Sequence, residues 1–255
     1  MDCFLDFFIF FALILFIVEN NPIKLLTLKH KKMRTIMKAT AAIMLMTVVM
    51  MATGCKNNKL NGHEYVDLGL PSGTMWATCN VGAETPKDYG NYYAWGETEP
   101  KDVYDEASYK FFKEGKYTKY CDDTIHGYNG LVDDLKTLQP EDDAATANWG
   151  AGWAMPTIDQ WYELEKNCVW TWKNNGYEIV GSNGNSIFLP AAGDKTNDSE
   201  NTDAGIVGIY WSNTISPQCS VVMAKGVVYT QDGKSPSFEA RHFGMSVRPV
   251  CSSKK

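Results

Sequence analysis

The chain lacks the residue patterns on which most metal-binding and catalytic sites depend. It has four histidines and no Cys-x-x-Cys pair, so the ligand spacing of a zinc site is missing. It has no Gly-x-Ser-x-Gly sequence, the nucleophile elbow of one class of serine hydrolases. No Asp-x-Asp-x-Asp-Gly ladder orders its acidic residues into a calcium loop. We therefore expect no metal ion, no cofactor and no enzymatic activity, and calcium has no motif to support it.

The chain is also poor in basic residues once its first 54 residues are set aside. Those residues hold six Lys and Arg and three Asp and Glu, which leaves 18 basic and 27 acidic residues and a net charge of −9. Nucleic acids attract basic surfaces, so we expect no nucleic-acid partner. Thirteen of the acids fall between Glu97 and Asp143. We interpret that region as solvated and loop-rich; the alternative is a calcium-binding surface.

The N-terminal part predicts export. A basic patch precedes sixteen uncharged residues, Ala39–Gly54, in the pattern of a secretory signal. The uncharged run is short for a membrane span, which needs about 20 apolar residues. Upstream, the apolar segment 7–18 has no basic residue before it. We expect residues 1–32 to be an over-called start, with translation beginning at Met33 or Met37; the alternative is an extra membrane segment.

The end of this leader, Met51-Ala52-Thr53-Gly54-Cys55, resembles the lipobox of bacterial lipoproteins, in which small residues precede a cysteine that receives lipid. Ala52 stands where such motifs usually carry Leu. The resemblance implies that residues 33–54 are a signal peptide and that Cys55 is lipidated. It implies a protein of the cell envelope, anchored to the outer membrane, on the periplasmic or the cell-surface face. Residues 55–62 are expected to be a polar tether.

Five cysteines follow Cys55, and an oxidising compartment permits disulfides among them. Because five is odd, at least one thiol stays free or pairs between molecules. All eight Trp and all thirteen Tyr also follow Cys55. Such rings suit a core built from large side chains with polar handles; the alternative is a glycan-stacking surface. We expect Trp153 and Trp161 to be core residues.

One helix is predicted by two independent patterns. Thr157 and Gln160 have the spacing of a capping box. Ile158, Trp161, Leu164 and Cys168 then follow at helical spacing and form one apolar face. Together with the strand signals below, this helix predicts an α+β domain with a mostly antiparallel sheet, one or two packed helices and long loops.

Strands are predicted where alternating or β-branched runs are bounded by turn residues. They cover residues 65–68, 74–81, 177–180, 186–189, 206–211, 220–224, 227–230 and 244–250. Lys225-Gly226 is interpreted as a tight hairpin turn between two of these strands. Residues 85–140 are predicted to be long loops with short helical pieces. Arg248, inside the closing strand, is expected to satisfy a buried carboxylate or buried carbonyls.

Six short blocks of the mature chain form an ordered set: Tyr65–Ala77, Tyr92–Thr98, Gly152–Thr157, Ile187–Gly193, Tyr210–Ser212 and Ser246–Val250. In this order they resemble the Fibrobacter succinogenes major paralogous domain family, most of whose members are lipoproteins or surface proteins. The resemblance covers about residues 63–251, which we expect to be a single domain. The family is similar to the C-terminal domain of a bacterial collagen-like adhesin, which implies a C-type-lectin-like fold.

The resemblance also implies a disulfide and a ligand face. Lectin-like domains often tie a helix to the final strand, and Cys168 and Cys251 are the matching candidates, with a stabilisation of about 4 kcal/mol in the chain-entropy model. The ligand face is implied in the polar loop that begins at Asp194 and around Arg241-His242. Candidate ligand-binding residues are Asp194, Asn197, Asp198, Asp203, Trp211, Asn213, Arg241 and His242. The other interpretation of the loop is a solvated connection with no role.

Calcium-dependent lectins carry Glu-Pro-Asn or Gln-Pro-Asp together with Trp-Asn-Asp, and the chain has neither; Trp211-Ser212-Asn213 only partly matches the latter. The function we favour is a lipid-anchored, extracytoplasmic binding module that acts in adhesion or captures a glycan or protein. A second hypothesis is a structural envelope or appendage component that binds another protein of the same cell. A third is an enzyme on the same fold.

Overall fold

The computed structural model describes residues 58–197, 201, 203–216 and 222–252. The predictions for the leader, Cys55 and Asp198 lie outside these residues. Residues 57–255 form one compact unit. Its described part contains two α-helices, α4 (Ala144–Trp149) and α5 (Ile158–Asn167), and strands that pair mostly antiparallel. The domain is therefore α+β, as predicted.

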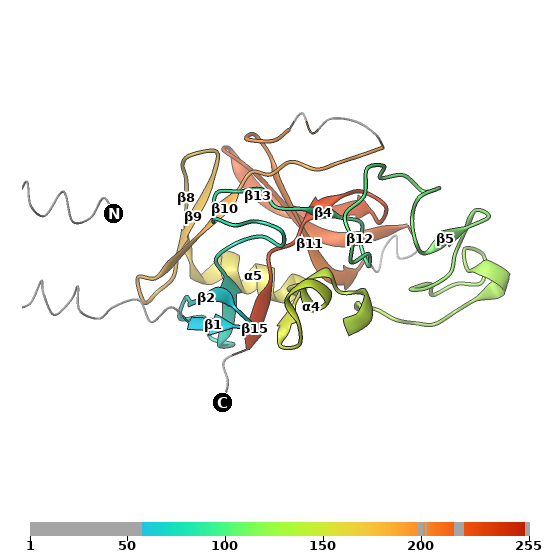
Figure 1. The fold of residues 1–255 in the computed structure, drawn as a ribbon, viewed down its shortest axis with the longest axis horizontal. Helices are drawn as coiled ribbons and strands as arrows, with labels where there is room; N and C mark the ends of the chain where they lie inside the picture. The colour runs from blue at the N-terminus through green and yellow to red at the C-terminus, as the bar shows by residue number, and fades with distance from the viewer. Residues whose placement is uncertain (1–57, 198–200, 202, 217–221, 253–255) are drawn as a thin grey trace, which may run out of the picture. The chain divides into compact units, whose positions relative to one another are not determined.

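The described strands form three sheets and one short hairpin (Figure 1). The terminal sheet has the order β1 (Asn58–Leu60), β2 (His63–Asp67), β3 (Thr74–Ala77), β15 (Val250–Ser252) and β7 (Trp153–Ala154). The long-strand sheet has the order β13 (Gly233–Ala240), β12 (Met223–Thr230), β11 (Gly208–Ile215), β14 (Met245–Ser246) and β4 (Tyr92–Tyr93). The three-stranded sheet has the order β10 (Ser186–Pro190), β9 (Gly176–Val180) and β8 (Val169–Trp172).

Between β4 and α4 the chain has little regular structure, as predicted. It forms the hairpin of β5 (Phe112–Lys113) and β6 (Lys116–Tyr117) and two 3-10 turns, η1 (Tyr128–Gly130) and η2 (Pro140–Asp142). In Figure 1 this region, in green, lies at the end of the domain away from β8, β9 and β10.

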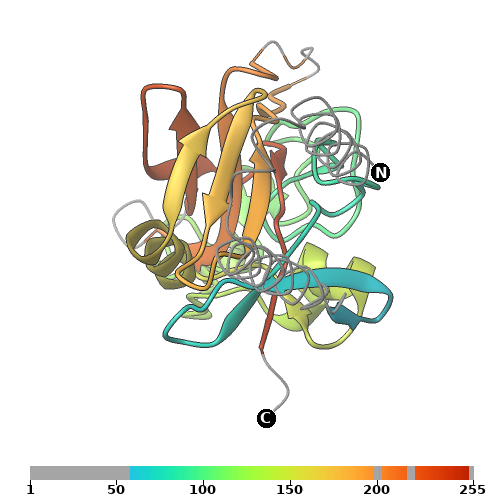
Figure 2. The ribbon, with the colours of Figure 1, turned by 90° about the vertical axis from the view of Figure 1, so that its left-hand side faces the viewer.

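Two hydrophobic clusters occupy opposite sides of the long-strand sheet. Trp211 and Trp153 belong to the first cluster, and Tyr210 and Trp161 belong to the second. Successive side chains of a strand point to opposite faces, which is why the neighbours Tyr210 and Trp211 enter different clusters. Helix α5 and the three-stranded sheet (Figure 2) contribute to the second cluster. Trp153 and Trp161 are each 1% exposed, which confirms that they are core residues.

Helix α5 forms as the sequence predicts. The Thr157 side chain accepts a hydrogen bond from the Gln160 main-chain N–H (3.1 Å), and the Gln160 side chain accepts one from the Thr157 N–H (2.9 Å). This capping box satisfies two N–H groups that the first turn leaves without partners. Ile158, Trp161 and Leu164 are buried and fix the helix against the second cluster.

The predicted hairpin turn at Lys225-Gly226 is wrong. Strand β12 runs straight through both residues, and the turn follows Thr230, where β12 pairs with the unpredicted strand β13. Gly226 lies opposite Trp211 in the sheet, and a Cβ atom there would be 2.6 Å from the Tyr210 carbonyl oxygen. Glycine is therefore needed at this position for close backbone packing and not for a turn.

The expected tether is partly folded. Asn58–Leu60 form strand β1, in which Lys59 lies opposite Glu64 of β2. The Leu60 carbonyl accepts a hydrogen bond from the Trp153 indole N–H (3.0 Å), and the Leu60 side chain packs against the first cluster. The folded domain thus begins before residue 63, because Leu60 can bury apolar surface in a stretch that otherwise looks polar.

The closing strand is also divided. Met245–Ser246 pair with β11 and β4 in the long-strand sheet, whereas Val250–Ser252 pair with β3 and β7 in the terminal sheet. Residues 247–249 pass from one sheet to the other. The sequence predicted one strand because both halves are apolar and the change of sheet leaves no pattern.

Arg248 lies in this crossing and is fully buried, as expected. Its guanidinium donates four hydrogen bonds of 2.8–3.0 Å, to the Asn80 side chain and to the carbonyls of Ala77, Thr78 and Phe188. Burial lowers the pKa of the Arg248 guanidinium, and nearby Tyr210 and Cys79 act in the opposite direction. The side chain joins the end of β3 to β10 and satisfies acceptors that would otherwise be buried without partners.

The structure does not form the disulfide implied between Cys168 and Cys251, and both are free thiols in it. Val250 packs in the second cluster beside α5, whereas Cys251 packs in the first cluster. Cys168 packs against the second cluster, so the two sulfurs point to different sides of β15. The pairing stays a prediction that peptide mapping of the unreduced protein tests.

Replacement of Arg248 should destabilise the domain strongly. In Arg248→Met, four acceptors lose their donor inside the protein, and each buried acceptor left unsatisfied costs about 1–3 kcal/mol. We expect the free energy of unfolding, measured by urea denaturation, to fall by at least about 4 kcal/mol. A loss below about 1 kcal/mol would show that Arg248 does not connect β3 to β10 in solution.

Candidate functional site

Three segments that are distant in sequence meet at one surface, which we call the three-segment face: residues 101–108, 194–197 and 241–244. Tyr104 and Asn197 exchange two backbone hydrogen bonds, of 2.8 and 2.9 Å. Lys195 and Gly244 exchange two more, both of 2.8 Å. The face therefore brings together the polar loop at Asp194 and the Arg241-His242 turn.

Three carboxylates gather beside this face. Burial raises the pKa of Asp194, and the neighbouring Asp203 raises it further. Burial also raises the pKa of Glu239, with Asp194 as the second cause. Asp194 and Glu239 are about half buried and Asp203 is exposed. Burial and mutual repulsion both disfavour the charged form of these carboxylates, which makes them candidates for contact with a ligand.

His242 extends the face toward residues 101–108. Its ring is half buried and packs edge-on against Phe243, with ring centroids 4.8 Å apart. Burial lowers the pKa of His242, whereas Glu106 and Asp105 act in the opposite direction. The imidazole is therefore within electrostatic reach of two acids from a segment that the sequence did not connect to it.

The two other described candidates differ in how far a ligand could reach them. Asn197 is exposed and has a positive φ of 55°, which Asn tolerates better than most residues. Asn213 is half buried, and its main chain holds Leu138 and Pro156 by hydrogen bonds of 3.0 and 2.8 Å. Asn197 thus belongs to the face, whereas Asn213 connects loops behind it.

The predicted ligand contacts of Trp211 and Arg241 need correction, because both side chains are fully buried. The Trp211 indole N–H donates to the Tyr93 carbonyl (2.8 Å) inside the first cluster. A ligand on the surface does not reach either residue. The partial match of Trp211-Ser212-Asn213 to a lectin triplet is explained by packing, since adjacent strand residues serve opposite faces of the sheet.

Arg241 lies buried beneath the three-segment face and bonds to the loops around it. Its guanidinium lies 4.6–5.9 Å from the ring centroids of Trp95, Tyr109, Tyr117 and Tyr120. It also donates to the Tyr109 hydroxyl and to the carbonyls of Lys119 and Tyr120, each at 3.1 Å. These contacts tie the turn at residues 241–244 to the loop region before α4.

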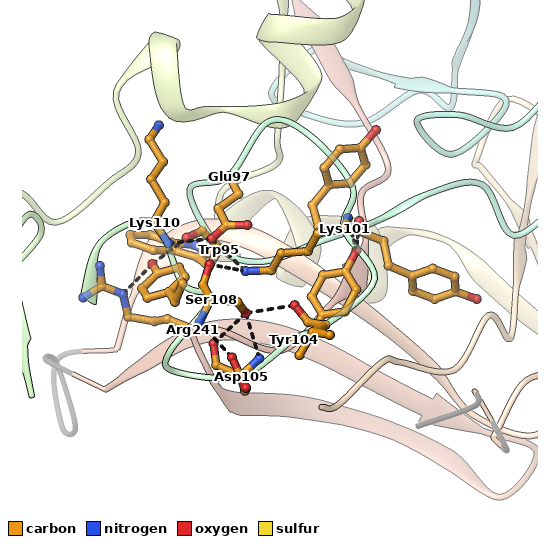
Figure 3. A network of polar contacts seen from close by, with 12 residues as sticks. Trp95, Glu97, Lys101, Tyr104, Asp105, Ser108, Lys110 and Arg241 are labelled. Atoms are coloured by element: carbon orange, nitrogen blue, oxygen red, sulfur yellow. Dashed lines mark hydrogen bonds and ion pairs between the residues drawn. The ribbon is translucent and has the colours of Figure 1, made fainter. Parts of the chain in front are cut away.

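Glu97 holds the segment 101–108 through a contact with Lys101 (Figure 3). Its carboxylate accepts from Lys101 Nζ (3.0 Å) and from the Lys110 main-chain N–H (2.7 Å). Lys101 Nζ also donates to the Ser108 carbonyl (3.0 Å). Glu97 and Lys101 are both largely buried, so solvent screens this ion pair only weakly. The pair joins the two ends of the short loop between these residues.

Other acids between residues 97 and 143 likewise bond within the protein. Asp142 pairs with Lys110 (2.8 Å) and Lys119 (2.5 Å). Asp143 caps α4 and also accepts from the Met155 N–H (2.8 Å). Within the described ranges, no group of three or more His, Cys, Asp or Glu side chains has an arrangement that could hold a metal ion. These buried acids are thus structural, a role that neither the solvated nor the calcium interpretation gave them.

Sequence reasoning missed Glu239 and residues 101–108. Glu239 lies in β13, whose Lys-Ser-Pro-Ser composition hides the strand, and only its position two residues before Arg241 could have suggested it. The segment 101–108 carries no motif, and backbone pairing alone places it at the face.

Comparisons with protein-family models, with curated proteins and with solved structures gave no match. In the part of the chain that the structure describes, no helix has the length and apolar character needed to cross a membrane.

Replacement of Asp194 by Asn should stabilise the domain at neutral pH. In the folded protein the pKa of Asp194 is raised above its ordinary value of 3.8. Protonated Asp194 therefore contributes its full stabilisation below pH 3.8, and this contribution is lost as the pH rises through the folded-state pKa. Asp194→Asn removes this loss, and the gain at pH 7 should be below about 1 kcal/mol because the group is half exposed. Urea denaturation at pH 4 and pH 7 measures the difference.

The control is Asp232→Asn, which changes an exposed turn. Because the side chain is exposed and lies outside the three-segment face, this variant should leave the free energy of unfolding at pH 7 unchanged within about 0.5 kcal/mol. A decrease in stability at pH 7 in Asp194→Asn would contradict the assignment, because it would mean that the carboxylate makes favourable contacts that outweigh its burial.

Proposed function

We propose that this chain is a lipid-anchored, extracytoplasmic binding module of C-type-lectin-like fold, whose three-segment face binds a glycan. The observation that carries the proposal is the joining of residues 194–197 to residues 241–244 by paired backbone hydrogen bonds. The lectin-like resemblance expected ligand contacts from these two stretches. The α+β architecture, with α5 packed on sheets and long loops above them, is consistent with such a fold.

The chemistry of the face suits hydroxyl groups. Asp194 and Glu239 are partly desolvated carboxylates, which accept strong hydrogen bonds from the hydroxyls of a sugar. His242 adds a half-buried ring with one donor and one acceptor. Asn197 adds an exposed amide at the edge. The face is rigid because Arg241 and Glu97 fix the segments beneath it, so little ordering is needed on binding.

A glycan array tests the proposal with the purified protein, in calcium and in chelator. We expect saturable binding to one class of glycan that the chelator leaves unchanged. The double variant Asp194→Asn, Glu239→Gln should weaken that binding at least about tenfold, because hydrogen bonds to charged groups contribute about 1.5–3 kcal/mol.

The matched control is Asp159→Asn, Glu165→Gln, which makes the same chemical changes on α5. It should bind as the wild type does. Absence of glycan binding by the folded protein would contradict the proposal and would favour a protein partner in the envelope. Binding that is lost only in chelator would contradict the calcium-independent mode.

A further inference from the structure

A cavity of about 270 Å³ lies between the β1–β2 hairpin, the end of β3 and α4. Its polar lining residues are Lys59, His63, Glu64, Thr78, Cys79 and Glu84. None of them belongs to the three-segment face. The volume is slightly below the usual range of ligand pockets, about 300–1,000 Å³, so an occupant would be small.

An imidazole and a thiol share this cavity. Tyr65 of β2 lies opposite Ala77 of β3, and the Thr78 N–H donates to the Glu64 carbonyl (3.1 Å), which extends the register by one pair. His63 and Cys79 come next along the two segments, beyond the last paired residues of β3, and both line the cavity. The Cys79 Sγ lies 3.6 Å from Thr78 Oγ1 and 3.9 Å from the Glu84 carbonyl oxygen.

The imidazole is held in place by stacking. The His63 and Trp149 rings are 3.9 Å apart and inclined by 5°. Trp149 is itself packed in the first cluster, at the end of a helix capped by Asp143. Burial lowers the pKa of His63, which favours its neutral, proton-accepting form. A neutral imidazole in the same cavity as a thiol offers an acceptor for its proton when the sulfur reacts.

Charged groups lie near the thiol and at the mouth of the cavity. The Arg248 guanidinium lies next to the thiol's segment, since it donates to the carbonyl of Thr78, the residue before Cys79 (2.8 Å). At the mouth, Lys59 Nζ lies 3.3 Å from Glu64 Oε1, and both groups are about half exposed. One cation and one anion side by side match a ligand with an α-carboxylate and an α-ammonium group.

The other described cysteines differ from Cys79. Cys121 and Cys251 are buried, and burial raises the pKa of each, that of Cys251 to about 11. Burial also raises the pKa of Cys168, which is half buried and lies outside the cavity. Of the thiols in the described ranges, Cys79 is the one that combines an open cavity, a neighbouring imidazole and a nearby cation.

We infer that this cavity binds small zwitterionic disulfides of the cystine class and that Cys79 exchanges with them. The Cys79 thiolate attacks one sulfur of the ligand, the ligand's disulfide bond breaks, and a new disulfide joins Cys79 to that half. The other half leaves as a thiolate and takes up a proton. The ligand supplies the disulfide, so the exchange needs no further oxidant.

The test uses the full chain purified in detergent, reduced, freed of reductant and incubated with cystine. Peptide mass spectrometry follows the cysteine adduct at each thiol. We expect Cys79 to be modified at least about tenfold faster than Cys168. Cys79→Ser should remove the fast adduct, whereas the matched variant Cys168→Ser should retain it. His63→Gln should slow the reaction of Cys79 about tenfold and leave that of Cys168 unchanged.

Neutral hydroxyethyl disulfide is the second probe, because it offers the same exchange without the charged groups. The preference for Cys79 over Cys168 should be several-fold smaller with this probe than with cystine. Equal rates at the two thiols, or the same preference with both probes, would overturn the inference. A Cys79–Cys79 dimer as the sole product would also overturn it, by assigning the thiol to a second copy of the chain.

Discussion

Two buried arginines, Arg241 and Arg248, connect the parts of this domain. They precede and follow β14 in the sequence, and they bond mainly to main-chain carbonyls. Arg248 links the end of β3 to β10, and Arg241 links the last turn to the loops before α4. Arg248 lies where the chain crosses from the long-strand sheet to the terminal sheet, and Arg241 lies just before the last strand of the long-strand sheet. Loops cannot bury carbonyl groups without donors, and each guanidinium supplies several donors in a fixed geometry.

This arrangement explains how long loops can carry a rigid site. Residues 101–108 form no helix or extended strand, yet Lys101 bonds to Glu97 and to the Ser108 carbonyl, and Tyr104 pairs with Asn197. Asp194 and Glu239 can then be held partly desolvated, which a flexible loop would not sustain. A buried arginine also supports the cavity at Cys79. Arg248 donates to the Thr78 carbonyl at the end of β3 and lies within electrostatic reach of the thiol.

Local chemistry in the sequence predicted local structure well. The capping box of α5, the apolar face of that helix and the buried role of Arg248 depend on residues that are close in sequence or on the cost of burying a charge. Non-local packing was not predictable. Gly226 looks like a turn residue until Trp211 is known to lie opposite it, and Arg241 looks like a surface residue until four rings surround it.

The candidate site follows the same division. Asn197 and Asp203 are exposed and Asp194 and His242 are half buried, whereas Trp211 and Arg241 are interior. Glu239 and residues 101–108 could not be found, because they join the face only through strand pairing and backbone bridges. His63 and Cys79 likewise have no link in the sequence, and only the folded chain brings both to the lining of one cavity.

The central claim is that three distant segments form one rigid face, and amide hydrogen exchange tests it most directly. The amides of Tyr104, Lys195, Asn197 and Gly244 donate across the segments, so all four should exchange slowly in the native protein. In Arg241→Met they should lose protection together, while the amides in the body of α5 keep theirs. Exchange of the four amides at the rate of unprotected loops in the wild type would contradict the account.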